Sequence, residues 1–385
     1  YEISLCLVGS EMCIRDRINA VSSTSDVDQD AVVYVGTLGV EMNGITASLR
    51  AQIEASLSAA HNEVPVWVQD EAYVKSYHHY CKQILWPTFH YTLPTTQSLE
   101  EEPKAFRAYL EVNRRFAERL ASEFREGDVI LVQDYHLLLV PQLLRELLPR
   151  APIGLFVHVA FPSSEIFRCL SRREELLRGM LGADLLGFQT HNFCRHFRQT
   201  VGRILQEETT ARGVQLARSF VTVAPFPIGI DVHALNRRRS DPEVHEWVGR
   251  LQERFAGKHV IVGRDKLDWI KGVREKLIAF ELFLDTHPEW VGRVVLVQVA
   301  LATVQDNREV GDVSDIVSRI NRKHSSLTYQ PVVFLHVQEI TFSQYLALLT
   351  MADAFMATSL REGMNLTTHE YVAVSYTHLT LPTKA

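Results

Sequence analysis

Polar and charged side chains that could bind a ligand follow several apolar stretches of the chain. Asp134 and His158 each come directly after such a stretch, and Lys266, Lys271 and Glu362 follow two others. Carboxylates and a histidine can form hydrogen bonds with a polar ligand, and lysines can bind phosphate oxygens. These five residues are therefore the first candidates for a binding or catalytic site.

The two lysines suggest what kind of ligand. Lys266 and Lys271 stand beside Gly272, which precedes a stretch with helical apolar spacing. A helix N-terminus together with flexible cations suits a diphosphate, although each lysine alone could be a plain surface charge. The turn at residues 362–365, Glu-Gly-Met-Asn, would likewise direct backbone amides at an anion.

Two further features stay open. Residues 77–90 are rich in aromatic side chains, among them Tyr77 and Trp86. Such residues belong to a core or an interface, or they stack on a sugar ring while their polar tips donate hydrogen bonds. Asp134 taken alone is equally well interpreted as a helix cap.

Several classes of site and partner are not supported. The chain has no Walker A and no GxGxxG sequence, so neither a P-loop nor a dinucleotide cofactor is expected. It has no HExxH sequence, and His78 and His79 are adjacent, so no metal site is expected. The net charge of −6 argues against nucleic acid as a partner, and no stretch approaches the roughly 20 apolar residues that span a membrane. Five cysteines without a CxxC pair are typical of reduced thiols in a cytoplasmic protein.

The elements that must position these residues follow an α/β pattern. The chain has 385 residues, of which 46% are hydrophobic, and short apolar strands alternate with amphipathic helices from residue 128 onward. Strands are predicted at 129–133, 153–159, 184–188, 221–224, 259–263, 294–299, 332–336 and 354–358. Helices are predicted between them, and one begins at Gly363.

Residues 225–231, Pro-Phe-Pro-Ile-Gly-Ile-Asp, interrupt this rhythm, because two prolines and a glycine continue neither a strand ladder nor a helix. We therefore expect a hinge there and two α/β domains, 18–228 and a truncated 229–373. Parallel sheets bind ligands at the carboxyl ends of their strands, where the candidate residues stand.

The two ends of the chain do not continue the interior pattern. Residues 1–17 and 374–385 are similar to translated sequencing-adaptor sequence, and the first residue is Tyr1. Both segments are expected to be artefacts and to lie outside the fold, which leaves 18–373 as the native part of a fragment.

Taken together, the motifs resemble the trehalose-6-phosphate synthase family. The resemblance runs from about residue 34 to 373 and rests on these ordered segments: ILWPTFHY (84–91), QDYHL (133–137), VHVAFPSSEIF (157–167), LGFQT (186–190), LDWIKG (267–272), REGMNL (361–366) and EYV (370–372). It implies a GT-B glycosyltransferase fold of two facing Rossmann-like domains, with an N-terminal acceptor-binding domain and a C-terminal nucleotide-sugar domain. It also implies transfer of glucose from UDP-glucose to glucose 6-phosphate with retention.

The resemblance also implies roles for single residues. Tyr77, Trp86 and Asp134 would line the acceptor site, and His158 would lie beside the reacting glucose. Lys266 and Lys271 would face the diphosphate and stabilise the leaving group, which removes the need for a metal. Glu362 would hold hydroxyls of the donor glucose. The remaining donor contacts would be the amides of Gly363, Met364, Asn365 and Leu366, and the ribose contact of Glu370.

Three positions depart from the synthase pattern of that family. Lys266 stands where the family has arginine, Glu362 where it has aspartate, and Val304 where an arginine would bind the phosphate of the acceptor. The glycine-pair loop that closes over the donor is poorly matched by residues 36–39. Such departures resemble the synthase-like domains of bifunctional or regulatory trehalose proteins. Two expectations follow: an active synthase domain, or a non-catalytic regulatory or scaffold domain of a larger protein, with subunits of a trehalose-synthase complex as partners.

Overall fold

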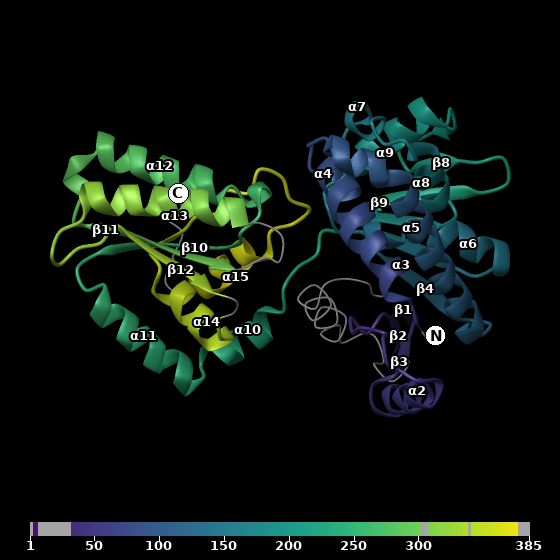
Figure 1. Ribbon diagram of the computed structural model, residues 1–385, viewed down its shortest axis with the longest axis horizontal. Coiled ribbons are helices and arrows are strands. Elements are labelled where there is room, and N and C mark those ends of the chain that lie inside the picture. Colours follow the sequence, from purple (N-terminus) through teal and green to yellow (C-terminus); the bar gives the residue numbers. More distant parts are fainter. Residues whose placement is uncertain (1–2, 7–31, 302–306, 338–339, 376–385) are drawn as a thin grey trace, which may run out of the picture. The chain divides into compact units, whose positions relative to one another are not determined.

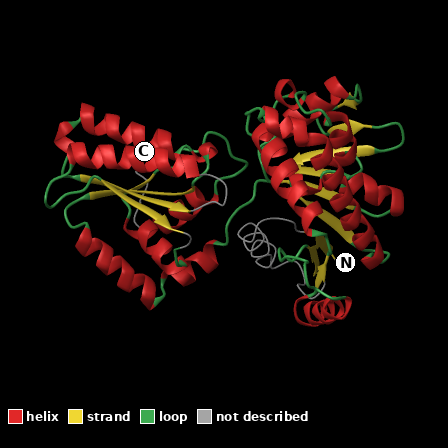
Figure 2. Ribbon diagram, viewed as in Figure 1, coloured by secondary structure: helices red, strands yellow, loops and turns green. Residues whose placement is uncertain are grey.

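The computed structural model describes residues 3–6, 32–301, 307–337 and 340–375 of the chain. The chain divides into two compact units, Tyr1–Ile228 and Gly229–Ala385. Each unit consists of a sheet with helices packed on its faces (Figures 1 and 2). None of the helices in the described part of the chain is both long and apolar enough to cross a membrane.

Within the described residues, the first unit contains a nine-stranded sheet with the order β3-β2-β1-β4-β5-β6-β9-β8-β7. In this order, β3, β2, β1, β4, β5, β6 and β9 are all parallel to their neighbours. Strands β8 and β7 follow β9 at the edge of the sheet, and they pair in antiparallel fashion. The strand bounds are β1 Ile3–Cys6, β2 Val32–Gly36, β3 Glu63–Pro65, β4 Val129–Gln133, β5 Ile153–Val157, β6 Leu185–Phe188, β7 Glu208–Thr209, β8 Gly213–Gln215 and β9 Phe220–Pro225.

The helices of the first unit include an uncommon π-helix, η2, over Lys75–Leu85. The π-helix is rare in proteins, and single π-helical turns are often found at functional sites. The other helices are α2 Ala47–His61, α3 Asp70–Val74, α4 Trp86–Phe89, α5 Thr96–Glu123, the 3₁₀ turn η3 Tyr135–Leu137, α6 Val140–Leu147, α7 Ser164–Phe167, α8 Arg173–Met180 and α9 His191–Ile204.

The second unit contains a parallel four-stranded sheet with the order β12-β11-β10-β13. Its strands are β10 His259–Lys266, β11 Val294–Leu301, β12 Val332–Val337 and β13 Ala354–Phe355. Its helices are α10 Val232–Arg239, α11 Pro242–Arg254, the 3₁₀ turn η4 Trp269–Lys271, α12 Val273–Thr286, the 3₁₀ turn η5 Pro288–Trp290, α13 Asn307–His324, α14 Phe342–Met351 and α15 Leu366–Ser375. In Figure 1, α12 and α13 lie side by side over one face of this sheet, and α11 and α14 lie over the other.

Strand β11 shows why the second unit is a sandwich of three layers. All eight of its residues are buried. Val294, Leu296 and Ala300 belong to the core beneath α12 and α13, whereas Val295 and Val297 belong to the core on the opposite face. A strand covered on both faces is almost entirely apolar, and β11 has Gln298 as its one polar residue.

These elements confirm the predicted α/β class and most of the predicted strand positions. The helix predicted from Gly363 instead begins at Leu366. Gly363 therefore lies in the turn that leads into α15 rather than in its first turn.

Both ends of the fold differ from the expected bounds. Residues 3–6, which the sequence pattern set apart with the leader, pair in parallel with β2 on one side and β4 on the other. At the other end, α15 continues past residue 373 to Ser375. Val374 is 2% exposed in the core formed with α10 and α14, and its carbonyl accepts a hydrogen bond from Arg239 Nη1 at 2.7 Å. Backbone pairing thus places residues 3–6 in the first sheet, and apolar burial places Val374 in a core of the second unit.

Candidate functional site

An aromatic cluster surrounds one lysine in the first unit. Tyr77 lies in η2 with its ring stacked on His136 at 5.4 Å between centroids. The ammonium of Lys82 lies 5.2 Å from the centroid of the Tyr77 ring and 4.9 Å from that of Trp86. It also donates a hydrogen bond to the Tyr135 hydroxyl at 3.1 Å. Two predicted acceptor residues, Tyr77 and Trp86, are thus brought together around a cation that the sequence pattern did not single out.

Asp134 and His158 are joined through the ends of two neighbouring strands. Asp134 follows β4, is 1% exposed, and has a φ of 71°, a backbone conformation that is costly for residues other than glycine. Its side chain does not cap the following 3₁₀ turn; Oδ1 instead accepts a hydrogen bond from the His158 backbone amide at 3.0 Å. The His158 ring donates from Nε2 to Gln133 Oε1 at 2.6 Å, so the ring orientation is fixed. Burial and strain concentrated at one strand end are typical of functional sites.

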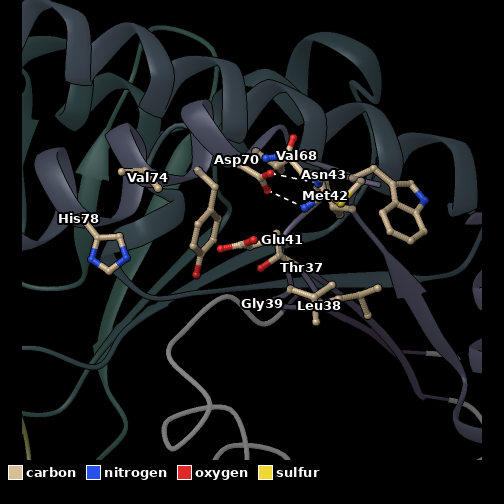
Figure 3. A pocket seen from close by; sticks show the side chains of 14 residues that line it. Thr37, Leu38, Gly39, Glu41, Met42, Asn43, Val68, Asp70, Val74 and His78 are labelled. Carbon is tan, nitrogen blue, oxygen red and sulfur yellow. Dashed lines mark hydrogen bonds between the residues drawn. The ribbon is translucent and has the colours of Figure 1, made fainter. Parts of the chain in front are cut away.

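A pocket of about 290 Å³ lies next to the aromatic cluster of the first unit (Figure 3). It is lined by the loop that follows β2, which includes residues 37–43, and by Tyr73 and His78. Asp70 fixes the loop, because its carboxylate accepts hydrogen bonds from the backbone amides of Met42 at 2.7 Å and Asn43 at 3.2 Å. None of the predicted site residues lines this pocket.

Tyr73 links the pocket to the aromatic cluster, since its ring stacks on Tyr77 at 5.4 Å with the planes 8° apart. Burial, with smaller contributions from Tyr77 and Cys81, raises the pKa of Tyr73 to about 12. The pKa of His78 is lowered by burial first and then by the nearby His79 and Lys82. At neutral pH, Tyr73 is therefore a neutral hydrogen-bonding group, and positive charge on His78 is disfavoured.

In the second unit, two predicted donor-site residues meet directly. Lys271, at the end of η4, forms an ion pair with Glu362 Oε1, and the Ser359 hydroxyl donates to the same oxygen at 2.8 Å. Both charged side chains are mostly covered, with exposed fractions of 26% for Lys271 and 16% for Glu362. Partial burial makes this pair stronger than one on an open surface.

Close backbone packing holds the two segments in place. Gly272 has a φ of 61°, and a Cβ there would lie 2.4 Å from the carbonyl oxygen of Thr358. The Thr358 hydroxyl donates to the Gly272 carbonyl at 3.0 Å, and the Leu360 amide donates to the Ile270 carbonyl at 2.8 Å. The N-terminus of α12 and the segment after β13 are therefore fixed against each other, which is what positions Lys271 beside Glu362.

Lys266 is not part of that contact. It ends β10, and among the described residues its ammonium forms no hydrogen bond or ion pair. The preceding residue, Asp265, faces the other side of the sheet, where its carboxylate contacts Lys276 Nζ at 2.6 Å and Gln298 Nε2 at 3.1 Å. Since side chains alternate along a strand, Lys266 faces away from this buried network.

The turn before α15 contains the predicted backbone donors. Asn365 is the N-cap of α15, because its Oδ1 accepts from the Thr368 amide at 3.1 Å. Gly363 and Met364 lie in the turn, and Leu366 is the first residue of the helix. These residues stand at a helix N-terminus that follows a strand, the position that favours anions.

Glu370, predicted to bind ribose, has neighbours that the sequence pattern missed. Its Oε2 accepts a hydrogen bond from the Tyr345 hydroxyl at 2.5 Å. The guanidinium carbon of Arg264 lies 4.6 Å from the centroid of the Tyr345 ring. Arg264 is two residues before Lys266 on the same strand, so strand alternation could have placed both on one face of the sheet.

Val304 and a metal site were the remaining subjects of the sequence analysis. Val304 lies outside the described residues. Within the described part of the chain, no group of three or more histidine, cysteine, aspartate or glutamate side chains is arranged to hold a metal ion.

Known proteins match the chain along nearly its whole length. Residues 10–380 match the model of glycosyltransferase family 20. The chain is 42% identical over 361 residues to a putative alpha,alpha-trehalose-phosphate synthase [UDP-forming] 106 kDa subunit of Schizosaccharomyces pombe, covering 92% of this chain and 38% of that protein. It is 40% identical over 365 residues to the trehalose synthase complex regulatory subunit TSL1 of Saccharomyces cerevisiae, covering 94% and 33%. It is 44% identical over 325 residues to the alpha,alpha-trehalose-phosphate synthase [UDP-forming] of Botryotinia fuckeliana, covering 82% and 61%. The chain thus spans less than two thirds of each of these relatives.

Solved structures show the same fold. The N-terminal domain of trehalose-6-phosphate phosphatase from Candida albicans superposes with a TM-score of 0.85 at 34% identity, covering 97% of this chain and 81% of that one. A structure described as trehalose-6-phosphate from E. coli bound with UDP-2-fluoro glucose superposes with a TM-score of 0.82 at 23% identity, covering 97% and 81%, and supports the GT-B fold alone. Because the family model matches most of the length of the chain, the chain belongs to glycosyltransferase family 20, the trehalose-6-phosphate synthase family.

Proposed function

We propose that this chain binds UDP-glucose and glucose 6-phosphate and transfers glucose between them with retention, giving trehalose 6-phosphate and UDP. The contact between Lys271 and Glu362, next to the N-terminus of α15, is the observation that carries the proposal. It places a cation, a carboxylate and helix-terminal amides together, as binding of a sugar diphosphate requires.

The roles of the donor residues follow from their chemistry. Lys266 and Lys271 stabilise the negative charge that develops on the leaving UDP, and the amides from Gly363 to Leu366 add to this stabilisation. Glu362 accepts hydrogen bonds from glucose hydroxyls, and Glu370 from the ribose. None of these residues needs to act as a nucleophile.

The acceptor side uses the first unit. Tyr77 and Trp86 provide aromatic surface for the sugar ring, and Asp134 accepts from its hydroxyls. His158 lies at the reacting glucose, where its backbone is fixed by Asp134. The strained and buried position of Asp134 supports this role, because strain is retained where function requires a geometry.

Release of UDP tests the proposal. The purified chain is mixed with UDP-glucose and glucose 6-phosphate, and UDP is measured by a coupled assay, with each substrate omitted in turn as the control. UDP formation that requires both substrates is expected. Binding of UDP-glucose without any UDP formation would reject catalysis and support the second candidate.

That second candidate is a non-catalytic regulatory or scaffold domain of a larger trehalose-pathway protein. It is favoured by the engagement of Glu362 with both Lys271 and Ser359, since a carboxylate already satisfied within the protein is less available to a sugar. The regulatory relative TSL1 is about as similar to this chain as the synthases are. In this case subunits of a trehalose-synthase complex are the partners, and co-purification with a catalytic subunit tests it.

A cytoplasmic location fits either candidate. Cys81, Cys169 and Cys194 are free thiols. Free thiols persist in reducing compartments. Labelling of the exposed Cys169 in intact cells by a permeable thiol reagent checks the location.

A further inference from the structure

Lys82 has no carboxylate partner among the described residues, and it lies among the residues proposed to bind the acceptor in the first unit. Its Nζ lies 5.2 Å, 4.9 Å and 5.8 Å from the ring centroids of Tyr77, Trp86 and Tyr135. Among the described residues, its hydrogen bond goes to the Tyr135 hydroxyl and no acidic side chain pairs with it. A half-buried ammonium in contact with neutral aromatic groups can still pair with an external anion.

The π-helix creates this arrangement. Tyr77 and Lys82 are five residues apart in η2, and a π-helix has i to i+5 hydrogen bonding. Residues with this spacing lie near one another in η2, whereas an α-helix would turn them to different sides. Trp86 follows directly after η2. The helix type thus brings the ammonium and the two acceptor rings to one place.

The groups around Lys82 indicate the class of anion. Aromatic faces next to a lysine suit a ligand that has both a sugar ring and a phosphate, because the ring stacks while the phosphate pairs with the ammonium. Such a phosphate lacks one expected partner in this chain, since Val304 stands where the family has an arginine. A lysine can replace the charge of that arginine from another element, although without its two-pronged geometry.

We propose that Lys82 binds the phosphate of a hexose phosphate whose ring lies against Tyr77 and Trp86. The inference rests on the proposed function, because that function assigns these two residues to the acceptor. It goes further by naming the cation that takes over acceptor-phosphate recognition in this chain. Lys82 is a specificity residue: it selects phosphorylated over unphosphorylated sugar.

The test compares glucose 6-phosphate with glucose by titration calorimetry on the full chain. Replacing the ammonium in Lys82→Met is expected to weaken binding of glucose 6-phosphate by about tenfold or more and to leave glucose binding unchanged. Lys82→Arg keeps the charge and is expected to retain most of the affinity. Raising the salt concentration from about 0.05 M to about 0.3 M is expected to weaken the binding of glucose 6-phosphate relative to glucose in the wild type. The same change is not expected to affect this difference in Lys82→Met.

A matched control comes from the second unit. Lys258 also stacks on an aromatic ring, with Nζ 5.5 Å from the centroid of Tyr329. Lys258→Met removes a comparable lysine and is expected to leave binding of glucose 6-phosphate unchanged. Lys82→Gln is a second neutral variant, and circular dichroism verifies that each variant is folded.

The opposite results overturn the inference. If Lys82→Met and Lys82→Gln bind glucose 6-phosphate as tightly as the wild type or more tightly, Lys82 covers the aromatic rings instead of binding the phosphate. Wild-type protein that binds glucose 6-phosphate no better than glucose also overturns it. Failure of the proposed catalysis is a separate outcome: loss of phosphate-dependent binding in Lys82→Met, together with no UDP release by the wild type, supports the role of Lys82 and rejects only glucosyl transfer.

Discussion

Lys271 and Glu362 form an ion pair between residues 91 positions apart in the chain. Each was predicted to touch a different part of the same donor, Lys271 the diphosphate and Glu362 the glucose. In the structure each side chain is also the ion-pair partner of the other. The charge of the lysine is therefore partly neutralised before any ligand binds, and the carboxylate of Glu362 reduces its attraction for a diphosphate.

Glu362→Gln should strengthen the binding of UDP. The amide keeps the size of the side chain and removes its negative charge, so Lys271 is available to the diphosphate. We expect an increase in UDP affinity of about threefold to tenfold, measured by titration calorimetry. Glu275 is an exposed residue of α12 next to Arg274, and Glu275→Gln is the control that should not change UDP affinity. Weaker binding of UDP by Glu362→Gln would show that Glu362 orients Lys271 rather than competing for it.

Lys266→Arg should improve both UDP affinity and turnover. Among the described residues the Lys266 ammonium forms no ion pair, and an arginine offers a planar fork that binds two phosphate oxygens at once. An increase of several-fold in UDP affinity is expected, followed by titration and by the UDP-release assay. Lys258→Arg tests whether any added guanidinium has this effect. Equal affinity in Lys266→Arg and wild type would mean that residue 266 does not contact the diphosphate.

The sequence pattern predicted β4, β5, β6, β9 and β10 to β13, and the residues at their ends, because a buried parallel strand has a recognisable apolar run. It did not predict β1, β2, β3, β7 or β8. Val294–Leu301 is one such apolar run, and Asp134 and His158 stand at the ends of two others. Positions fixed by local hydrophobicity and by a recognisable motif can thus be located from sequence.

Contacts that depend on backbone detail could not be predicted. Lys82 joins Tyr77 only because Lys75–Leu85 is a π-helix, and a pattern based on 3.6 residues per turn separates the two. The hydrogen bond from Tyr345 to Glu370 depends on how α14 packs against α15, which residue spacing within either helix does not specify. The pairing of Lys271 with Glu362 likewise depends on how two distant segments pack together, and residue spacing within either segment does not specify it.

Lys276→Met should strongly destabilise the second unit. Lys276 is fully buried and pairs with Asp265 and Gln298 in the core between β10, β11 and α12. Burial lowers the pKa of Lys276, and the charge of Asp265 opposes that shift. Removing the lysine leaves a buried carboxylate without its cation, which costs about 3–5 kcal/mol. Urea unfolding measures this loss.

The double variant Lys276→Met with Asp265→Asn separates charge from packing. Because no charge remains buried, it should recover a large part of the lost stability. A double variant as unstable as Lys276→Met alone would attribute the loss to packing around the methionine instead.

Acid should weaken the contact between α12 and α13 in a defined way. Glu281 accepts hydrogen bonds from Arg319, and Asp285 from Lys323, each pair 38 residues apart. The pKa of Glu281 is lowered from 4.5, chiefly by the hydrogen bond from Arg319, and that of Asp285 from 3.8, chiefly by the hydrogen bond from Lys323. A carboxyl whose pKa is lower in the folded state stabilises the fold above its unfolded value, and this contribution is lost as the pH falls through the folded value.

Glu281→Gln should therefore lower the melting temperature at pH 7 but not at low pH. The difference from the wild type should begin to shrink below about pH 4.5, where the unfolded carboxyl takes up a proton, and should vanish once the folded carboxyl is protonated as well. Thermal unfolding of wild type, Glu281→Gln, Arg319→Gln and the double variant at several pH values gives the coupling between the two side chains. Added salt should reduce that coupling at pH 7, since the Arg319 side chain is 48% exposed. A difference that stays constant down to pH 3 would assign the effect of Glu281 to packing on α13 rather than to its charge.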